Sequence, residues 1–143
     1  MFTSFFPKPK VFFSSLVLWA VICVSIWYGY HQELGELLGL PLAQTGPVIG
    51  LGYFVTHSFL LLYIYYTVSV LLFATVWMKL SPHPWQNWSI LGSAVILFST
   101  YFSVQVSVAI NHWRRPFFDL VQKALSAEST VQASELYELL LVF

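Results

Sequence analysis

Stretches without charged residues divide the chain into three predicted membrane-spanning segments. Asp, Glu, Lys and Arg are absent from three long stretches, residues 11–32, 37–78 and 80–113. A charged side chain costs roughly 2.5–3.5 kcal/mol at the centre of a membrane helix, and a span takes about 20 apolar residues. Glycine and proline, which break helices, interrupt the second stretch before Tyr53 and the third before Ser89. The pattern therefore predicts three transmembrane helices, at about 11–30, 53–78 and 89–110.

The chain after the third predicted span is amphipathic and then becomes apolar again. Phe117, Val121 and Leu125 recur on one helical face of the segment at about 116–127, which is typical of a helix lying at the membrane interface. The residues at about 135–143 predict the start of a fourth span that is too short to cross a bilayer. We therefore expect this sequence to be part of a larger transmembrane domain.

Composition supports an all-α membrane protein and excludes several other classes. Apolar residues make up 58% of the chain and charged residues only 8%, whereas charged residues make up about a quarter of a soluble domain. Six basic residues are balanced by six acidic ones, which leaves no basic surface for nucleic acid, and the single Cys23 excludes a disulfide scaffold. The sequence has no nucleotide-binding, catalytic or metal-ligand motif, so we expect neither an enzyme nor a cofactor or metal. The predicted partner is the lipid bilayer.

The distribution of basic residues predicts the orientation. Lys8 and Lys10 precede the first span, whereas the following loop at 32–52 carries Glu33 and Glu36 but no Lys or Arg. Loops on the cytoplasmic side are enriched in Lys and Arg, so the N-terminus is predicted to be cytoplasmic and this loop external. By alternation the turn at 81–88 is cytoplasmic and the segment after the third span is external.

Four residues are candidates for a substrate path or for helix packing. His57, near the start of the second span, is either a hydrogen-bonded imidazole at the interface or a proton relay or substrate contact. Ser103 and Ser107 belong to a polar face of the third span, which is either a seam against another helix or the wall of a water-filled path. Gln105 lies on another side of that helix, and its amide requires an interhelical partner or a cavity.

Three strings rich in Pro, Trp, His and Asn are more specific than the apolar runs. They are MFTSFFPKPKVFF, SPHPWQNWSILGSAVILF and NHWRRPFFDLVQKALS. In order and spacing they resemble the SbmA/BacA family of bacterial inner-membrane peptide transporters. The positions that carry the resemblance include Pro7, Pro9, Ser81, Pro82, His83, Trp85, Gln86, Trp88, Asn111, Trp113, Pro116, Phe117, Asp119 and Gln122.

The resemblance implies a homodimeric carrier in the bacterial inner membrane. Such a carrier is similar in helix arrangement to the membrane domain of an ABC exporter without the ATPase, and it imports peptides and peptide antibiotics using the proton gradient. The chain would supply the N-terminal part of that carrier. The alternative is a small accessory or non-functional membrane protein that packs against a larger partner. We expect Asn111, Trp113 and Asp119 to form a structural junction where the third span ends, rather than a catalytic site.

Overall fold

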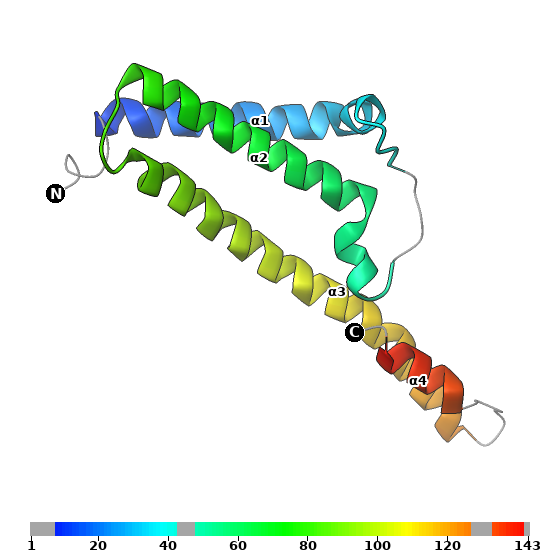
Figure 1. Ribbon diagram of the computed structural model, residues 1–143. Coiled ribbons are helices and arrows are strands. Elements are labelled where there is room, and N and C mark those ends of the chain that lie inside the picture. Colours follow the sequence, from blue (N-terminus) through cyan, green and yellow to red (C-terminus); the bar gives the residue numbers. More distant parts are fainter. Residues whose placement is uncertain (1–7, 43–47, 127–132, 142–143) are drawn as a thin grey trace.

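The computed structural model describes residues 8–42, 48–126 and 133–141, and within these ranges the secondary structure is entirely helical (Figure 1). The elements in chain order are α1 (Pro9–Leu37), the 3₁₀ helix η2 (Leu51–Val55), α2 (His57–Leu80), the π-helical turn η3 (Trp88–Gly92), α3 (Ser93–Leu125) and α4 (Ala133–Leu141). Three helical segments, α1, α2 and η3 with α3, are long and apolar enough to cross a membrane. The all-α class and the three predicted apolar helices are therefore confirmed.

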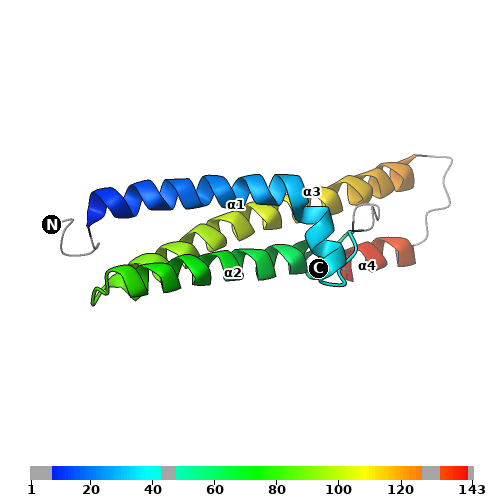
Figure 2. The same ribbon diagram turned by 90° about the horizontal axis from the view of Figure 1, so that it is seen from above.

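Helices α1 and α2 form an antiparallel hairpin, which Figures 1 and 2 show from two sides. Aromatic side chains pack between them where α1 begins and α2 ends: the ring centroids of Phe12 and Phe73 are 5.9 Å apart, and those of Phe12 and Trp77 are 5.2 Å apart. All three side chains are buried. The Trp77 indole N–H donates to the Ser15 hydroxyl at 3.1 Å, which gives a partner to a group that lipid cannot hydrogen-bond.

The other end of the hairpin depends on two glycines. Gly39 follows α1 with φ +70°, a left-handed conformation that costs glycine little. Its N–H bonds the carbonyl of Glu36 at 3.1 Å and the N–H of Leu40 bonds that of Gly35 at 2.7 Å, the two bonds of a Schellman motif. A Cβ built on Gly35 would lie 2.7 Å from the carbonyl oxygen of Leu40 and 3.6 Å from the Leu61 side chain. Glycine at position 35 therefore lets the chain turn back closely over the end of α1.

Helix α3 diverges from α2 after the turn that joins them, and η2 lies in the wide end between the two helices (Figure 1). From the middle of α2, the Tyr66 hydroxyl donates to the carbonyl of Ala94, near the start of α3, at 2.7 Å. Farther along, the rings of Tyr63 and Phe98 lie 5.7 Å apart. The helices leave many large apolar side chains exposed. Each helical segment contains an apolar stretch of 18 residues, and only a small share of that stretch is buried within the chain: 6% in α1, 22% in α2 and 6% in η3 with α3.

The C-terminal part differs from the sequence prediction. The segment predicted as a separate interfacial helix at about 116–127 is the last part of α3, which continues through Pro116 to Leu125. Pro116 has no backbone N–H to donate, so the carbonyl one turn earlier loses its helical hydrogen bond, but the helix does not end. Proline is tolerated within a helix where such a carbonyl can bond to another group or to solvent. Helix α2 begins at His57 rather than at about 53, since Tyr53 belongs to η2. Helix α4 coincides with the start of the predicted fourth span; residues 142–143 of that prediction lie outside the described ranges.

Candidate functional site

The structure joins Gln105 to the segment before α2. The Tyr53 hydroxyl, on η2, donates to the Gln105 side-chain oxygen at 3.0 Å, and both residues are half-buried. Aromatic rings of η2 pack on the neighbouring helices: the ring centroids of Tyr53 and Phe59 are 4.9 Å apart, and those of Phe54 and Phe102 are 4.9 Å apart. These five residues form what we call the Gln105 junction. Tyr53 is thus the hydrogen-bond partner that we expected for the Gln105 amide, although Tyr53 lies on a 3₁₀ helix rather than on a spanning helix.

His57 lies at the first position of α2, not one turn inside a span. Its Nδ1 lies 3.1 Å from the carbonyl oxygen of Pro41, an acceptor, so Nδ1 carries the proton in this arrangement. The side chain is exposed. Across the described residues no hydrogen bond joins His57 to Gln105, Ser103 or Ser107, which favours the interpretation of His57 as a hydrogen-bonded imidazole that ties the preceding loop to the helix end.

Ser103 and Ser107 lie on an exposed face of α3. Each hydroxyl donates to a carbonyl one turn earlier on its own helix, Ser103 to Ser99 at 2.9 Å and Ser107 to Ser103 at 3.2 Å. Thr100 does the same with the carbonyl of Ile96 at 2.9 Å. At about 100° per residue, the residues of this polar face are Ser89, Ser93, Thr100, Ser103, Ser107 and Asn111. No described helix covers the face, so both alternatives, a helix seam and the wall of a water-filled path, stay predictions.

The first part of the second sequence string, residues 81–87, forms the turn between α2 and η3. The backbone N–H of Gln86 donates to the carbonyl of His83 at 3.1 Å, and the Gln86 side-chain oxygen accepts from the His83 N–H at 3.2 Å. His83 Nδ1 in turn accepts from the Trp85 N–H at 3.3 Å. Gln86 is only 2% exposed, and its side-chain NH₂ has no hydrogen-bond partner among the described residues. A buried amide in this turn was not apparent from the sequence, since the residues on either side of it, Trp85 and Asn87, are both exposed.

The third string lies within α3 and contacts α4. The Trp113 indole N–H donates to the Leu139 carbonyl at 2.6 Å, and the ring stacks on Phe117 with centroids 4.9 Å apart. Leu139 is near the end of α4, where carbonyls have no partner within the helix, so this bond satisfies one of them. The prediction that Asn111 and Asp119 join Trp113 in a junction at a helix end is wrong. α3 does not end there, and neither side chain hydrogen-bonds another described residue.

These contacts place two of the three characteristic strings at the two ends of one long helix. Pro9, from the first string, is in the first turn of α1, where its missing N–H costs no helical hydrogen bond; Pro7 lies outside the described residues.

Residues 82–143 match the model of the SbmA/BacA-like family. The resemblance inferred from the sequence is thereby confirmed for this stretch, which is less than half of the chain.

The SbmA/BacA-like stretch includes the buried Gln86, the polar face of α3 and the contact between Trp113 and α4. SbmA/BacA proteins are transporters rather than enzymes, and the chain is similar to them over residues 82–143. Neither α1 nor α2 lies within the matched stretch. The Gln105 junction links that stretch to the earlier part of the chain, since Gln105 belongs to it and Tyr53 does not.

Proposed function

We propose that this chain forms part of a carrier that imports peptides and peptide antibiotics across the bacterial inner membrane, driven by the proton gradient. The observation that carries the proposal is the SbmA/BacA-like match over the turn, α3 and α4. Three helices apolar enough to cross a membrane are in keeping with it. We further propose a homodimer with an arrangement like that of ABC exporter membrane domains, and an N-terminus on the cytoplasmic side.

The polar face of α3 is the part of the chain best suited to line a peptide path. Its side chains other than Ser89 are exposed, and the hydroxyls of Thr100, Ser103 and Ser107 already donate to carbonyls of their own helix. Such hydroxyls keep their oxygen lone pairs available to water or to peptide N–H groups without leaving an unpaired donor. Lipid offers no hydrogen bond to these lone pairs, so the face is better placed toward a water-filled path or another helix than toward acyl chains.

A double substitution tests the proposal. Ser103→Leu with Ser107→Leu removes two hydroxyls and adds apolar bulk to the proposed path, while leaving the helix propensity favourable. The complete reading frame that contains this chain would be expressed in a strain lacking its own peptide carrier. We would then measure uptake of a labelled peptide antibiotic with and without a protonophore. The expected result is uptake that the protonophore abolishes and that the double substitution lowers by about tenfold, corresponding to about 1.4 kcal/mol.

The matched control places the same change on α1. Ser14 and Ser25 are also exposed helical serines, so Ser14→Leu with Ser25→Leu tests added bulk without touching the polar face of α3. Uptake in this control should stay within about twofold of the parent, in line with the small effect of surface changes. Absence of uptake by the parent at normal membrane levels, or equal loss in both double variants, would contradict the proposed path.

A second candidate function is that of an accessory subunit. It is favoured by the small share of the most apolar 18-residue stretch that is buried within the chain, only 6% in α1 and 6% in η3 with α3. In that case the chain would co-purify with a larger membrane protein, and the double substitution on α3 would disrupt the complex while the parent alone shows no uptake. Chemical cross-linking in intact membranes followed by mass measurement separates this outcome from a homodimeric carrier.

A further inference from the structure

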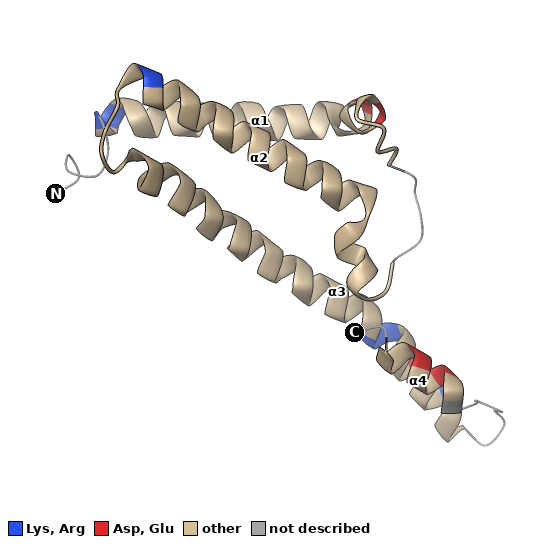
Figure 3. Ribbon diagram, in the orientation of Figure 1, with Lys and Arg blue, Asp and Glu red and all other residues tan. Residues whose placement is uncertain are grey.

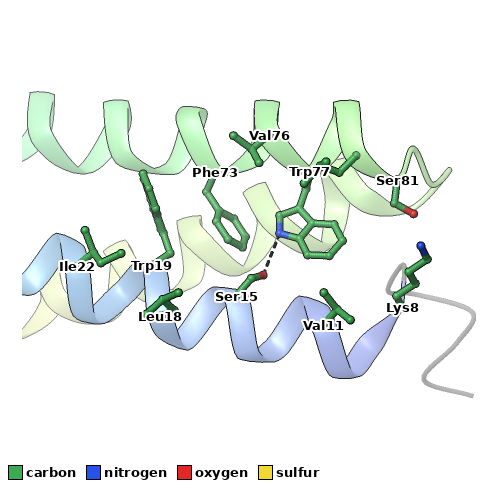
Figure 4. Close-up of a pocket in the computed structure, with 11 residues that line it drawn as sticks. Lys8, Val11, Ser15, Leu18, Trp19, Ile22, Phe73, Val76, Trp77 and Ser81 are labelled. Carbon is green, nitrogen blue, oxygen red and sulfur yellow. Dashed lines mark hydrogen bonds between the residues drawn. The ribbon is translucent and has the colours of Figure 1, made fainter.

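A groove of about 440 Å³ runs between α1 and α2 beside the Phe12, Phe73 and Trp77 cluster (Figure 4). Its walls are mostly apolar and come from both helices; they include Val11, Leu18, Trp19, Ile22, Phe73 and Val76. The polar group inside it, the Ser15 hydroxyl, already accepts from the Trp77 indole N–H at 3.1 Å. The inner part of the groove therefore suits an apolar occupant.

One end of the groove is basic. Lys8 and Ser81 line it, and Figure 4 shows the Lys8 amino group extending toward Ser81 beyond Val11 and Trp77. Lys10 is at the start of α1 and Lys79 in the last turn of α2, and Figure 3 shows basic residues where these two helix ends lie. The described Asp and Glu residues all lie away from this end, near the end of α1 and on α3 and α4. We call this region the lysine end. It carries an uncompensated positive charge next to an apolar groove.

The length of the groove fits one leaflet of a bilayer. From Lys8 to Ile22 the helix advances by about 21 Å at roughly 1.5 Å per residue. Half of a bilayer, headgroup region included, measures about 20–22 Å. A lysine at the surface and an apolar end near the bilayer midplane are the arrangement expected for a molecule with an anionic head and a single long apolar tail in the groove.

We propose that this groove is a binding site for an anionic phospholipid, with one acyl chain between α1 and α2 and the phosphate at Lys8 and Ser81. Anionic headgroups are attracted to basic residues next to membrane helices, by about 1 kcal/mol for each Lys or Arg. A second copy of the chain inserted in the same orientation would bring its own lysines to this end, where like charges repel. The charge therefore favours lipid over a second copy as the occupant.

Native mass spectrometry of the chain in detergent tests the site. Phosphatidylglycerol and phosphatidylcholine with identical acyl chains would be added in equal amounts. The parent should retain one phosphatidylglycerol in preference to phosphatidylcholine. Lys8→Gln should lower retention of phosphatidylglycerol by about fivefold, the effect of losing one basic residue near an anionic headgroup, and Lys8→Arg should keep it. Val76→Trp, which fills the groove, should abolish retention of either lipid.

Two matched controls separate the groove from general effects of charge and bulk. Lys123→Gln removes a basic residue far from the lysine end, and Val104→Trp adds an indole to an exposed position of α3 outside the groove. Both variants should retain lipid like the parent. Circular dichroism of each variant establishes that the helices are intact, and Lys8→Arg provides a folded variant should Lys8→Gln lose structure.

Four results would overturn the proposal. One is equal retention of the two lipids by the parent, and another is unchanged retention in Val76→Trp. The third is displacement of the lipid by millimolar inorganic phosphate, which would indicate a simple anion site. The fourth is conversion of a dimer to a monomer by Val76→Trp with the lipid count unchanged, which would identify the groove as an interface between two copies. None of these results bears on peptide uptake, so the outcome is independent of the proposed function.

Discussion

Replacing Gly35 by alanine should destabilise the hairpin of α1 and α2. The added Cβ would lie 2.7 Å from the carbonyl oxygen of Leu40, whereas ordinary contact begins at 3.4 Å. The atom in the way belongs to the backbone, and the N–H of the same residue bonds the Gly35 carbonyl at 2.7 Å. The clash therefore cannot be relieved by rotating a side chain, and any retreat of Leu40 strains the bond that closes the turn.

The magnitude follows from two opposing terms. Alanine is favoured over glycine within a helix by about 1 kcal/mol. Added atoms in a tightly packed position cost about 1–3 kcal/mol. Gly29 provides a matched control, because it lies in the same helix and a Cβ there has nothing within 4 Å. Since both substitutions share the helix term, Gly35→Ala should be less stable than Gly29→Ala by about 1–3 kcal/mol.

Thermal unfolding in detergent measures this difference. Cys23, the single cysteine of the chain, is half-buried in α1, so a maleimide dye that becomes fluorescent on reaction reports unfolding. For a chain of this size about 1 kcal/mol corresponds to roughly 2–5 °C in Tm. We expect Gly29→Ala to melt at or above the parent temperature and Gly35→Ala several degrees below Gly29→Ala. Equal melting temperatures for the two variants would refute the close approach at Gly35.

Two further predictions concern the C-terminal helix and the orientation. Trp113→Phe removes the indole N–H that bonds the Leu139 carbonyl and should weaken docking of α4 by about 0.5–1.5 kcal/mol, seen as faster amide hydrogen exchange in α4. The same change at the exposed Trp88 should leave exchange in α4 unaltered. With the native cysteine replaced, a cysteine at Leu38 should react with a membrane-impermeant thiol reagent in intact cells and one at His83 should not. The reverse labelling pattern would show that the N-terminus is external.

The distribution of charge along the chain predicted most of the architecture. Lys10, Glu33, Glu36, Lys79 and Arg114 bound the apolar stretches. Helices α1 and α2 extend only a few residues beyond these stretches, whereas α3 continues past Arg114 to Leu125. The prediction succeeds because insertion of a segment into a bilayer depends on the summed transfer free energy of its own residues, and this sum follows directly from the local sequence. The specific order of Pro, Trp, His and Asn likewise indicates a resemblance to the SbmA/BacA-like family, and the match over residues 82–143 confirms it for that stretch.

Only the tertiary structure decided which polar groups meet and where close approaches occur. Tyr53 and Gln105 are 52 residues apart, and no local pattern shows that η2 turns inward to bring them together. The burial of Gln86 and the approach of Leu40 to Gly35 depend in the same way on how the chain folds back at a turn. The prediction of a separate helix beginning at about residue 116 was wrong, because proline usually ends a helix, whereas α3 continues through Pro116 to Leu125. Hydropathy determines which segments leave water, but pairwise contacts depend on how those segments cross, which is set by side chains that are distant in the sequence.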